Sequence, residues 1–209
     1  MKITSILCPD VEKSIKFISL ATTGLDIAKG AELVAVSLIQ YKPDAVCATH
    51  TLVQAVEDTD KLEESFQYHG FSKQYIAECG LSASQFREVL EQELKDSYLF
   101  GYNPEFMFQF LDIYGKPFIQ DLPLISKFVS SRLSLPEEIN NPQMFMAYAK
   151  AQVGKPLGLR KLGQSFGVSL PTDATASLQH PVEDNVALLQ QVWLQQVAPA
   201  EVTWLETHQ

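Results

Sequence analysis

The order in which hydrophobic periodicity changes along the chain constrains the fold more than any other feature of the sequence. Before residue 54 the apolar segments are short, rich in β-branched and aromatic residues, and separated by turn residues, which is typical of strands. A Pro43-Asp44 turn joins the second segment to the third and predicts that the two pair antiparallel. The predicted strands are Lys16–Ala21, Glu32–Tyr41 and Ala45–Val53.

After residue 54 most apolar residues recur at helical spacing, and two short apolar segments between the predicted helices are typical of buried strands. Three antiparallel strands that lead into alternating strands and helices predict an α/β fold, with a mixed five-stranded sheet flanked by helices. The two further strands are Tyr98–Tyr102 and Phe118–Gln120; the helices are Ser72–Glu78, Ser82–Leu94, Asn103 to about Tyr114, Leu122–Ser131, Asn141–Ala151, Leu159–Phe166 and Glu183–Gln196.

Residues at the predicted helix ends agree with these boundaries. Asp121 is suited to cap the helix that follows it, and Gly167 is suited to close the helix before it. Ser82 and Ser84 are both good N-cap residues, but Arg87 stands three residues after Ser84, so we expect an incomplete capping box there.

The length of 209 residues suits one domain, and no linker is visible. We therefore expect a single domain over residues 1–209, with a core over about 15–197 and a short C-terminal extension over 198–209. Cys8, Cys47 and Cys79 are isolated, which indicates a reducing compartment and argues against a zinc site. We expect a cytoplasmic location and no membrane partner, because no apolar run approaches the ~20 residues of a membrane span.

The formal charge of −9 opposes nonspecific attraction to a polyphosphate. It does not exclude nucleic acid as a partner, because acidic active sites and local basic strips occur together in one protein. The compact basic strip of this chain consists of Lys155, Arg160 and Lys161, which we interpret as a solvated loop and helix start.

The segment Phe17–Leu25 reads F-I-S-L-A-T-T-G-L. It resembles the first motif of the DnaQ-like (DEDD) 3′–5′ exonucleases, in which a strand ends in D-x-E-T-T-G-L. Thr22, Thr23, Gly24 and Leu25 match that motif. Ser19 stands at the place of the aspartate, and Ala21 stands at the place of the glutamate.

Two later segments resemble the second and third motifs of the same family. In Leu99–Leu111, Gly101, Asn103 and Phe106 match, whereas Tyr102 takes the place of a histidine and Met107 that of an aspartate. In His180–Trp193, His180 resembles the general base and Asp184 the metal-binding acid, with an interval one residue shorter than usual. His69–Ser72, Asp121 and Leu157–Gly167 also resemble family features, so the resemblance extends from about Phe17 to Gln196.

The resemblance implies a ribonuclease H-like fold and an action on nucleic-acid 3′ ends. Family members hydrolyse a phosphodiester with two divalent ions, Mg²⁺ or Mn²⁺, held by four carboxylates. Ser19, Ala21 and Met107 occupy three of those four places, and Asp184 is the one acid that matches. We therefore expect no tightly bound cofactor and an impaired catalyst that acts as a binding module. The resemblance assigns nucleotide binding to Thr22, Thr23, Gly24, Leu25, Asn103 and Phe106.

Alternatives remain open at this point. The chain could be an active exonuclease whose Mg²⁺ or Mn²⁺ ligands lie at positions that do not align, or an interaction protein with no nucleic-acid role. Its partner is then a single-stranded 3′ end, another protein, or a second copy in a homodimer. His180 also fits a surface loop, and Asp184 also fits an acid that the macrodipole favours at a helix N-terminus.

Overall fold

The computed structural model describes residues 3–42, 48–111, 117–170 and 180–199. Within them a five-stranded sheet has the order β3-β2-β1-β4-β5. β1 pairs antiparallel with β2, which pairs antiparallel with β3, and β1 and β5 both run parallel to β4. The mixed sheet predicted from the sequence is therefore confirmed. The strands are β1 (Ser14–Thr22), β2 (Leu33–Gln40), β3 (Thr49–Val53), β4 (Ser97–Gly101) and β5 (Ile119–Asp121).

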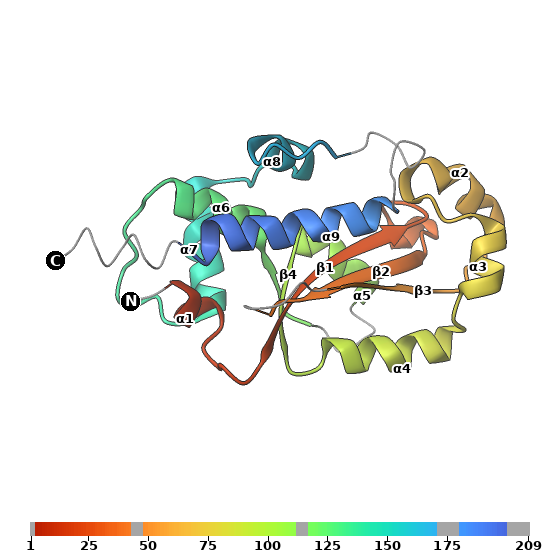
Figure 1. Ribbon diagram of the computed structural model, residues 1–209, viewed down its shortest axis with the longest axis horizontal. Coiled ribbons are helices and arrows are strands. Elements are labelled where there is room, and N and C mark those ends of the chain that lie inside the picture. Colours follow the sequence, from red (N-terminus) through yellow and green to blue (C-terminus); the bar gives the residue numbers. More distant parts are fainter. Residues whose placement is uncertain (1–2, 43–47, 112–116, 171–179, 200–209) are drawn as a thin grey trace.

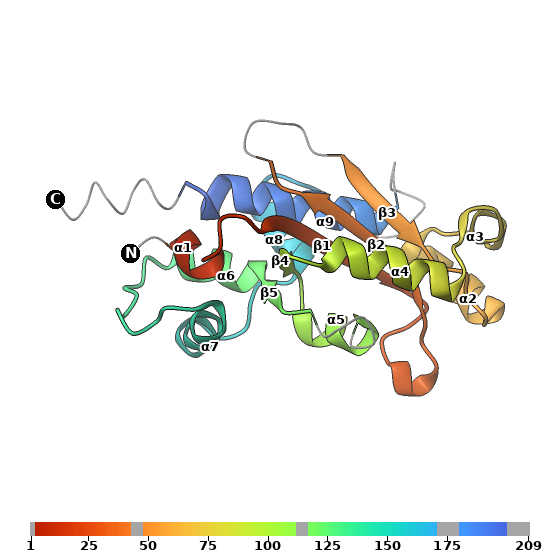
Figure 2. The same cartoon turned by 90° about the horizontal axis from the view of Figure 1, so that it is seen from below.

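Helices cover both faces of this sheet. Figures 1 and 2 show α9 lying across one face and α4 lying on the other. The described helices are α1 (Ile3–Leu7), α2 (Thr59–His69), α3 (Lys73–Cys79), α4 (Ala83–Leu94), α5 (Pro104–Leu111), α6 (Leu122–Ser130), α7 (Pro142–Val153), α8 (Leu159–Ser165) and α9 (Pro181–Val192), with a 3₁₀ turn η1 (Ile27–Lys29) and a π-helical turn η4 (Trp193–Val197). None of these described helices is long and apolar enough to cross a membrane.

The alternation of side chains along β1 divides the core into two sides. Phe17 lies on the α9 side, in a buried cluster that also contains residues of α6, α7, α9 and η4. Ile18 lies on the α4 side, in a cluster with residues of α4 and α5. Trp193 is 2% exposed and packs its ring 4.7 Å from that of Phe100 and 6.1 Å from that of Phe17. These aromatic contacts fix the end of α9 against β1 and β4.

Most predicted elements lie where the sequence places them, with boundaries shifted by a few residues. The described part of the third predicted strand is β3, from Thr49, and the predicted start at Ala45 lies outside the described residues; α9 begins at Pro181 rather than Glu183. The earlier helix start has a physical reason, since proline is pre-organised for the first helical position. The Pro43-Asp44 turn and the helix end at Tyr114 lie outside the described residues.

Two helix caps show how local residues set these boundaries. Asp121 accepts a hydrogen bond from the Leu124 amide (3.1 Å), so it caps α6 as predicted. The expectation of an incomplete capping box on α4 is wrong. Ser82 is the N-cap, and Gln85 completes the box by returning its side chain to the Ser82 amide.

Helix α2 has no counterpart among the predicted elements. The residues that it buries are Leu62, Ser65 and His69, two of which are polar. A helix whose buried side is polar gives little hydrophobic periodicity, which explains why the sequence pattern did not reveal it.

Candidate functional site

The residues of the first and second motifs meet at one edge of the sheet. β1 and β4 run parallel, with Phe17 opposite Phe100, so their carboxyl ends lie at the same edge. Thr22 is the last residue of β1, and Tyr102 follows the last residue of β4. In open α/β sheets, ligands bind outside the carboxyl ends of the strands, where neighbouring connections diverge. This edge is therefore the candidate site.

A tight turn follows β1 at this edge. The pairing with β2 shifts register between Ala21 and Thr22, as at a β-bulge. The Thr22 hydroxyl then donates to the carbonyl of Gly24 at 2.6 Å. A Cβ added to Gly24 would lie 3.2 Å from the Cβ of Ala31, so the close approach of the two chain segments favours glycine there.

Thr23 closes the base of the loop that carries Leu25. Its amide donates to the Glu32 carbonyl at 2.9 Å, and its hydroxyl accepts from the Glu32 amide at 2.8 Å. The Glu32 carboxylate accepts in turn from the amides of Glu57 and Asp58, which anchors the loop to the start of α2. Leu25 is left 81% exposed. The motif residues thus build a braced loop that presents one large apolar side chain to solvent.

Ser19 belongs to a row of hydroxyl side chains beneath α9. Ser19 pairs with Ser37, which pairs with Thr51, across three neighbouring strands. Thr51 donates its proton to Glu183 at 2.7 Å, so Ser37 must donate to Thr51, with the two oxygens 2.8 Å apart. The carboxylate of Glu183 is thereby held toward β3 by a neutral hydroxyl chain.

Ala21 lies in an apolar environment. It is 6% exposed and belongs to a buried cluster that includes Phe71 and Val182. The other members of that cluster are also hydrophobic: Val34, Ala35, Val53, Leu62 and Ile76. The hydrophobic neighbours of this position suit a small apolar side chain better than a carboxylate.

Met107 packs on the other side of the sheet. Its side chain is 2% exposed and belongs to the cluster that contains Ile18 and residues of α4. A Cβ on Gly101 would lie 2.7 Å from its sulfur, so the thioether fills the space over the end of β4. The structure therefore does not bring Met107 together with Ser19 and Ala21.

His180 is held by aromatic rings of the α2–α3 region. Its ring stacks on Phe71 with centroids 3.8 Å apart and planes 16° apart, and the ring of Tyr75 lies 5.4 Å away. As the N-cap residue of α9 it makes no side-chain capping bond. Since Phe71 shares a cluster with Ala21, His180 does lie near the carboxyl end of β1.

A second histidine supports this aromatic stack from inside. His69 is 2% exposed, and its Nδ1 accepts from the Phe71 amide at 2.9 Å. The neutral ring therefore carries its proton on Nε2, which lies 3.0 Å from the hydroxyl of Ser65. Burial lowers the pKa of His69 to about 4, and the nearby His180 adds to the decrease. His69 is thus a neutral structural residue near pH 7.

The sheet-facing side of α9 consists of Val182, Val186, Leu189 and Trp193, all of which are buried. Asp184 lies about 200° around the helix from Val182, which directs its half-buried side chain away from the sheet. Asn185 lies within the sheet-facing range, three residues after Val182. Asn185 is also one residue farther from His180 than Asp184 is, which is the usual interval of the family motif. That interval is the sequence signal that places Asn185, rather than Asp184, at the position of the metal-binding acid.

The second-motif residues begin helix α5. Asn103 has a left-handed backbone (φ 54°), and its carbonyl accepts from the amides of Phe106 and Met107 at 3.0 and 3.2 Å. Its side chain is exposed beside the candidate site. Phe106 is half-buried and packs its ring 5.2 Å from that of Phe110, so it contributes mainly to the core.

Acidic groups lie farther along the same edge. Asp121 ends β5 directly beside Gly101, and burial raises its pKa to about 6 against the opposing effect of the Leu124 amide. Glu105 on α5 pairs with Lys150 on α7 at 2.8 Å. Within the described residues, no group of three His, Cys, Asp or Glu side chains is arranged to hold a metal ion.

The donor set at the first-motif positions does not fit two divalent ions. Mg²⁺ requires oxygen ligands in near-octahedral geometry, and carboxylates must offset the repulsion between two dications. Ala21 has no ligand atom, and Ser19 offers one neutral hydroxyl. Ion-dependent hydrolysis by the family's arrangement is therefore not available from these two positions.

Comparisons with known proteins agree with this architecture. No protein-family model matches the sequence, and no curated protein matches it. Among solved structures, exonuclease I from Methylocaldum szegediense is similar with a TM-score of 0.55 and 13% identity, covering 93% of this chain and 43% of that one. The Mg²⁺- and Mn²⁺-bound form of S. pombe Pop2p has a TM-score of 0.54 and 10% identity, covering 88% and 82%.

A third similar structure is E. coli exonuclease I in complex with a dT13 oligonucleotide, with a TM-score of 0.54 and 13% identity. It covers 94% of this chain and 44% of its own, so this chain spans less than half of the length of the exonuclease I proteins. At these identities the likeness establishes the fold and no more. The chain thus has the ribonuclease H-like fold of the DnaQ-like (DEDD) exonucleases that its sequence motifs resemble.

Proposed function

We propose that this protein binds the 3′ end of a single-stranded nucleic acid at the carboxyl ends of β1 and β4, and that it has lost two-metal hydrolysis. The observation that carries the proposal is the environment of Ala21. Its place in the motif belongs to a carboxylate, yet it is 6% exposed among apolar side chains. A position adapted to hydrophobic packing no longer favours a charged ligand, whereas the neighbouring loop is intact.

Residues at the start of α9 also support the loss of hydrolysis. Helical geometry directs Asp184 away from the sheet and places the neutral Asn185 on the sheet-facing side. The carboxylate of Glu183 is held by Thr51 at 2.7 Å, toward β3. His180 is stacked on Phe71 with the tilted ring of Tyr75 beside it, and without a metal-bound water it has no proton to remove.

Binding is supported by the braced loop. Thr22, Thr23 and Gly24 form their hydrogen bonds within the loop and hold its backbone fixed, and Leu25 remains exposed beside the sheet edge. An exposed apolar side chain on a fixed loop can pack against the face of a terminal base, and full burial of a leucine side chain contributes about 1.5–3 kcal/mol. Asn103 adds an exposed amide at the end of β4, where it can donate to a phosphate or sugar oxygen.

End recognition is tested with a linear and a circular single strand of the same sequence. The protein should bind the linear strand about tenfold more tightly, as expected if the contact of one terminal base with Leu25 is lost without an end. Leu25→Ser should remove that preference. Val11→Ser is the matched control, because Val11 is also exposed (94%) but lies before β1 and far from the loop along the chain. Equal affinity for the two strands would contradict end binding.

Hydrolysis is tested separately with labelled strands in Mg²⁺ and in Mn²⁺. We expect no shortening of the strand beyond that seen with a heat-inactivated sample. Rapid trimming that Asp184→Ala abolishes would overturn the proposal and favour an active exonuclease with rearranged ligands. Binding to neither strand at low salt would instead favour an interaction protein with no nucleic-acid role.

A further inference from the structure

One segment of the chain differs in charge from the rest. Residues 139–170 contain four basic residues and no acidic one, whereas the whole chain carries −9. Lys150 is paired with Glu105 at 2.8 Å. The other three, Lys155, Arg160 and Lys161, are exposed and form no ion pair with any described acidic side chain. We call these three residues the basic strip.

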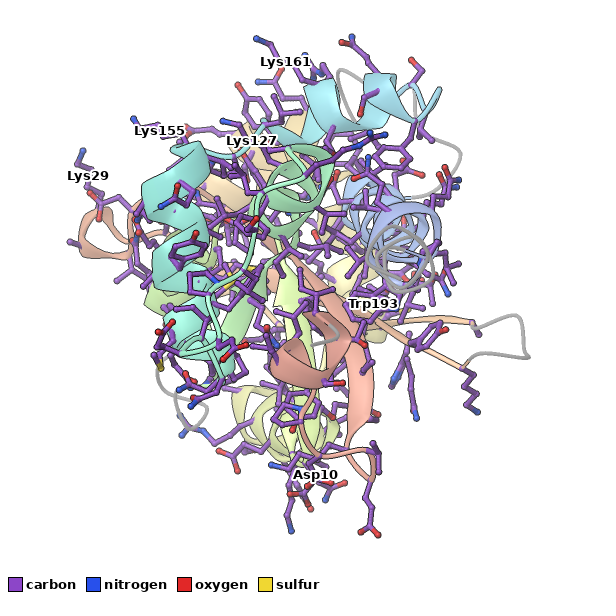
Figure 3. The ribbon with its side chains drawn as sticks, turned by 90° about the vertical axis from the view of Figure 1, so that its left-hand side faces the viewer. Asp10, Lys29, Lys127, Lys155, Lys161 and Trp193 are labelled. Carbon is purple, nitrogen blue, oxygen red and sulfur yellow. The ribbon has the colours of Figure 1, made fainter. Side chains whose placement is uncertain are left out.

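The start of the basic strip is fixed by Lys127. Lys127 on α6 is half-buried, and its Nζ donates to the carbonyls of Val153 (2.6 Å) and Lys155 (2.8 Å). These carbonyls lie at the end of α7, where the helix has no partners of its own for them. Figure 3 shows Lys127, Lys155 and Lys161 on one side of the molecule, away from Asp10.

The other end of the basic strip is fixed by α8. Leu162 and Gly163 directly follow Lys161 and are buried, and a Cβ on Gly163 would lie 3.4 Å from Leu188 of α9. The three cations are therefore held on a packed connection. Fixed cations that form no ion pair with a described acidic side chain keep more of their attraction for an added anion than paired cations do.

The basic strip begins beside the candidate site. Gly158 lies between Lys155 and Arg160, and a Cβ added to it would lie 4.0 Å from the hydroxyl of Tyr102. Tyr102 directly follows β4 and is half-buried at the edge where the candidate site lies. Leu157, 39% exposed, adds apolar surface between the cations.

We propose that the basic strip binds the phosphates of a single-stranded nucleic acid whose 3′ end occupies the candidate site. The proposal rests on the proposed function, because it extends the path of the same strand. The aromatic ring of Tyr102 beside the cations favours nucleic acid over an acidic peptide, since single strands are bound by cationic surfaces that carry aromatic side chains on which bases stack. The acidic remainder of the chain repels the strand elsewhere and so confines it to the strip.

The test measures the affinity of a fluorescent oligothymidylate at several salt concentrations. Neutralising the strip by Lys155→Gln, Arg160→Gln and Lys161→Gln should weaken binding at least about tenfold at 0.1 M salt and reduce the slope of log Kd against log salt by about 2. The matched control replaces Lys13, Lys42 and Lys95, which are also exposed, by glutamine and makes the same change in net charge. The control should leave the slope unchanged.

The outcomes separate this inference from the proposed function. If the strip variant and the control lose affinity and slope equally, the strip inference is overturned, whether or not end preference holds. If the strip variant alone loses slope while linear and circular strands bind equally, the strip is supported and end binding is wrong. Failure of the unaltered protein to bind the oligonucleotide at low salt overturns both. If the strip binds heparin but the protein does not bind the oligonucleotide, the ligand is a different polyanion, and the strip inference is also overturned.

Discussion

Replacing Ala21 by glutamate restores the carboxylate of the family motif, and the structure predicts that this change destabilises the protein. Ala21 is 6% exposed, and the hydrophobic cluster around it includes Phe71 and Val182. Buried glutamates in such surroundings have pKa values of about 8–9, roughly four units above the ordinary value, which corresponds to about 5 kcal/mol for the charged form. The added volume costs a further ~1–3 kcal/mol. Because the surrounding structure can relax around the new side chain, we expect Ala21→Glu to lower the free energy of unfolding by about 3–6 kcal/mol at pH 8.

The assay is urea denaturation of Ala21→Glu at pH 5 and pH 8, with Ala21→Gln as the uncharged control of similar size. A glutamate whose pKa is raised by folding contributes no penalty while it is protonated, and its penalty grows as the pH rises toward the pKa in the folded state. The difference between the two variants should therefore be small at pH 5 and should increase by several kcal/mol at pH 8. The glutamine variant should show only the cost of added volume at both pH values.

Two results would refute this reasoning. The first is equal stability of the glutamate and glutamine variants at pH 8, which would mean that the position is hydrated. The second is a rise in the stability of the glutamate variant with millimolar Mg²⁺ that the glutamine variant does not share. Selective binding of an ion to the folded state stabilises it by mass action. Such a rise would show that the site still accommodates a metal ion once a carboxylate is returned.

Three further changes test the core and the titrating groups. Trp193→Ala should lower the free energy of unfolding by about 3–5 kcal/mol. Trp193→Phe should lower it much less, because the buried indole nitrogen has no hydrogen-bond partner among the described residues. Equal losses for the two variants in urea denaturation would contradict this. His69→Gln should remove a loss of stability that develops as the pH falls from 6.5 toward 4, because the folded state resists protonation of this ring; an unchanged pH profile would show that His69 is not the responsible group. Asp121→Asn should remove the opposite trend, a loss of stability as the pH rises from about 4 to 6, because folding raises the pKa of this carboxyl. Thermal unfolding across that pH range measures the trend. The control is Asp26→Asn, at an exposed 3₁₀ turn.

The positions of the strands and of most helices could be predicted because they depend on local patterns. The β-branched residues of β2 and the apolar stripe of α9 each show a clear periodicity within a short stretch of sequence. Helix α2 could not be predicted in this way, because Ser65 and His69 occupy its buried side and satisfy each other through a hydrogen bond of 3.0 Å. That pairing depends on the packing of the folded chain and leaves no apolar repeat in the sequence.

The candidate site could likewise be predicted only in part from the sequence. The absence of carboxylates at Ser19 and Ala21 could be read directly from the sequence, since the chemical identity of a residue does not depend on the fold. Only the tertiary structure placed Met107 on the opposite side of the sheet, because a helix that follows β4 can direct that side chain toward either layer. Likewise only the packing of α9 on β1 decided that Asp184 is directed away from the sheet while Asn185 lies on its sheet-facing side, since rotation about the helix axis is set by which residues the core buries.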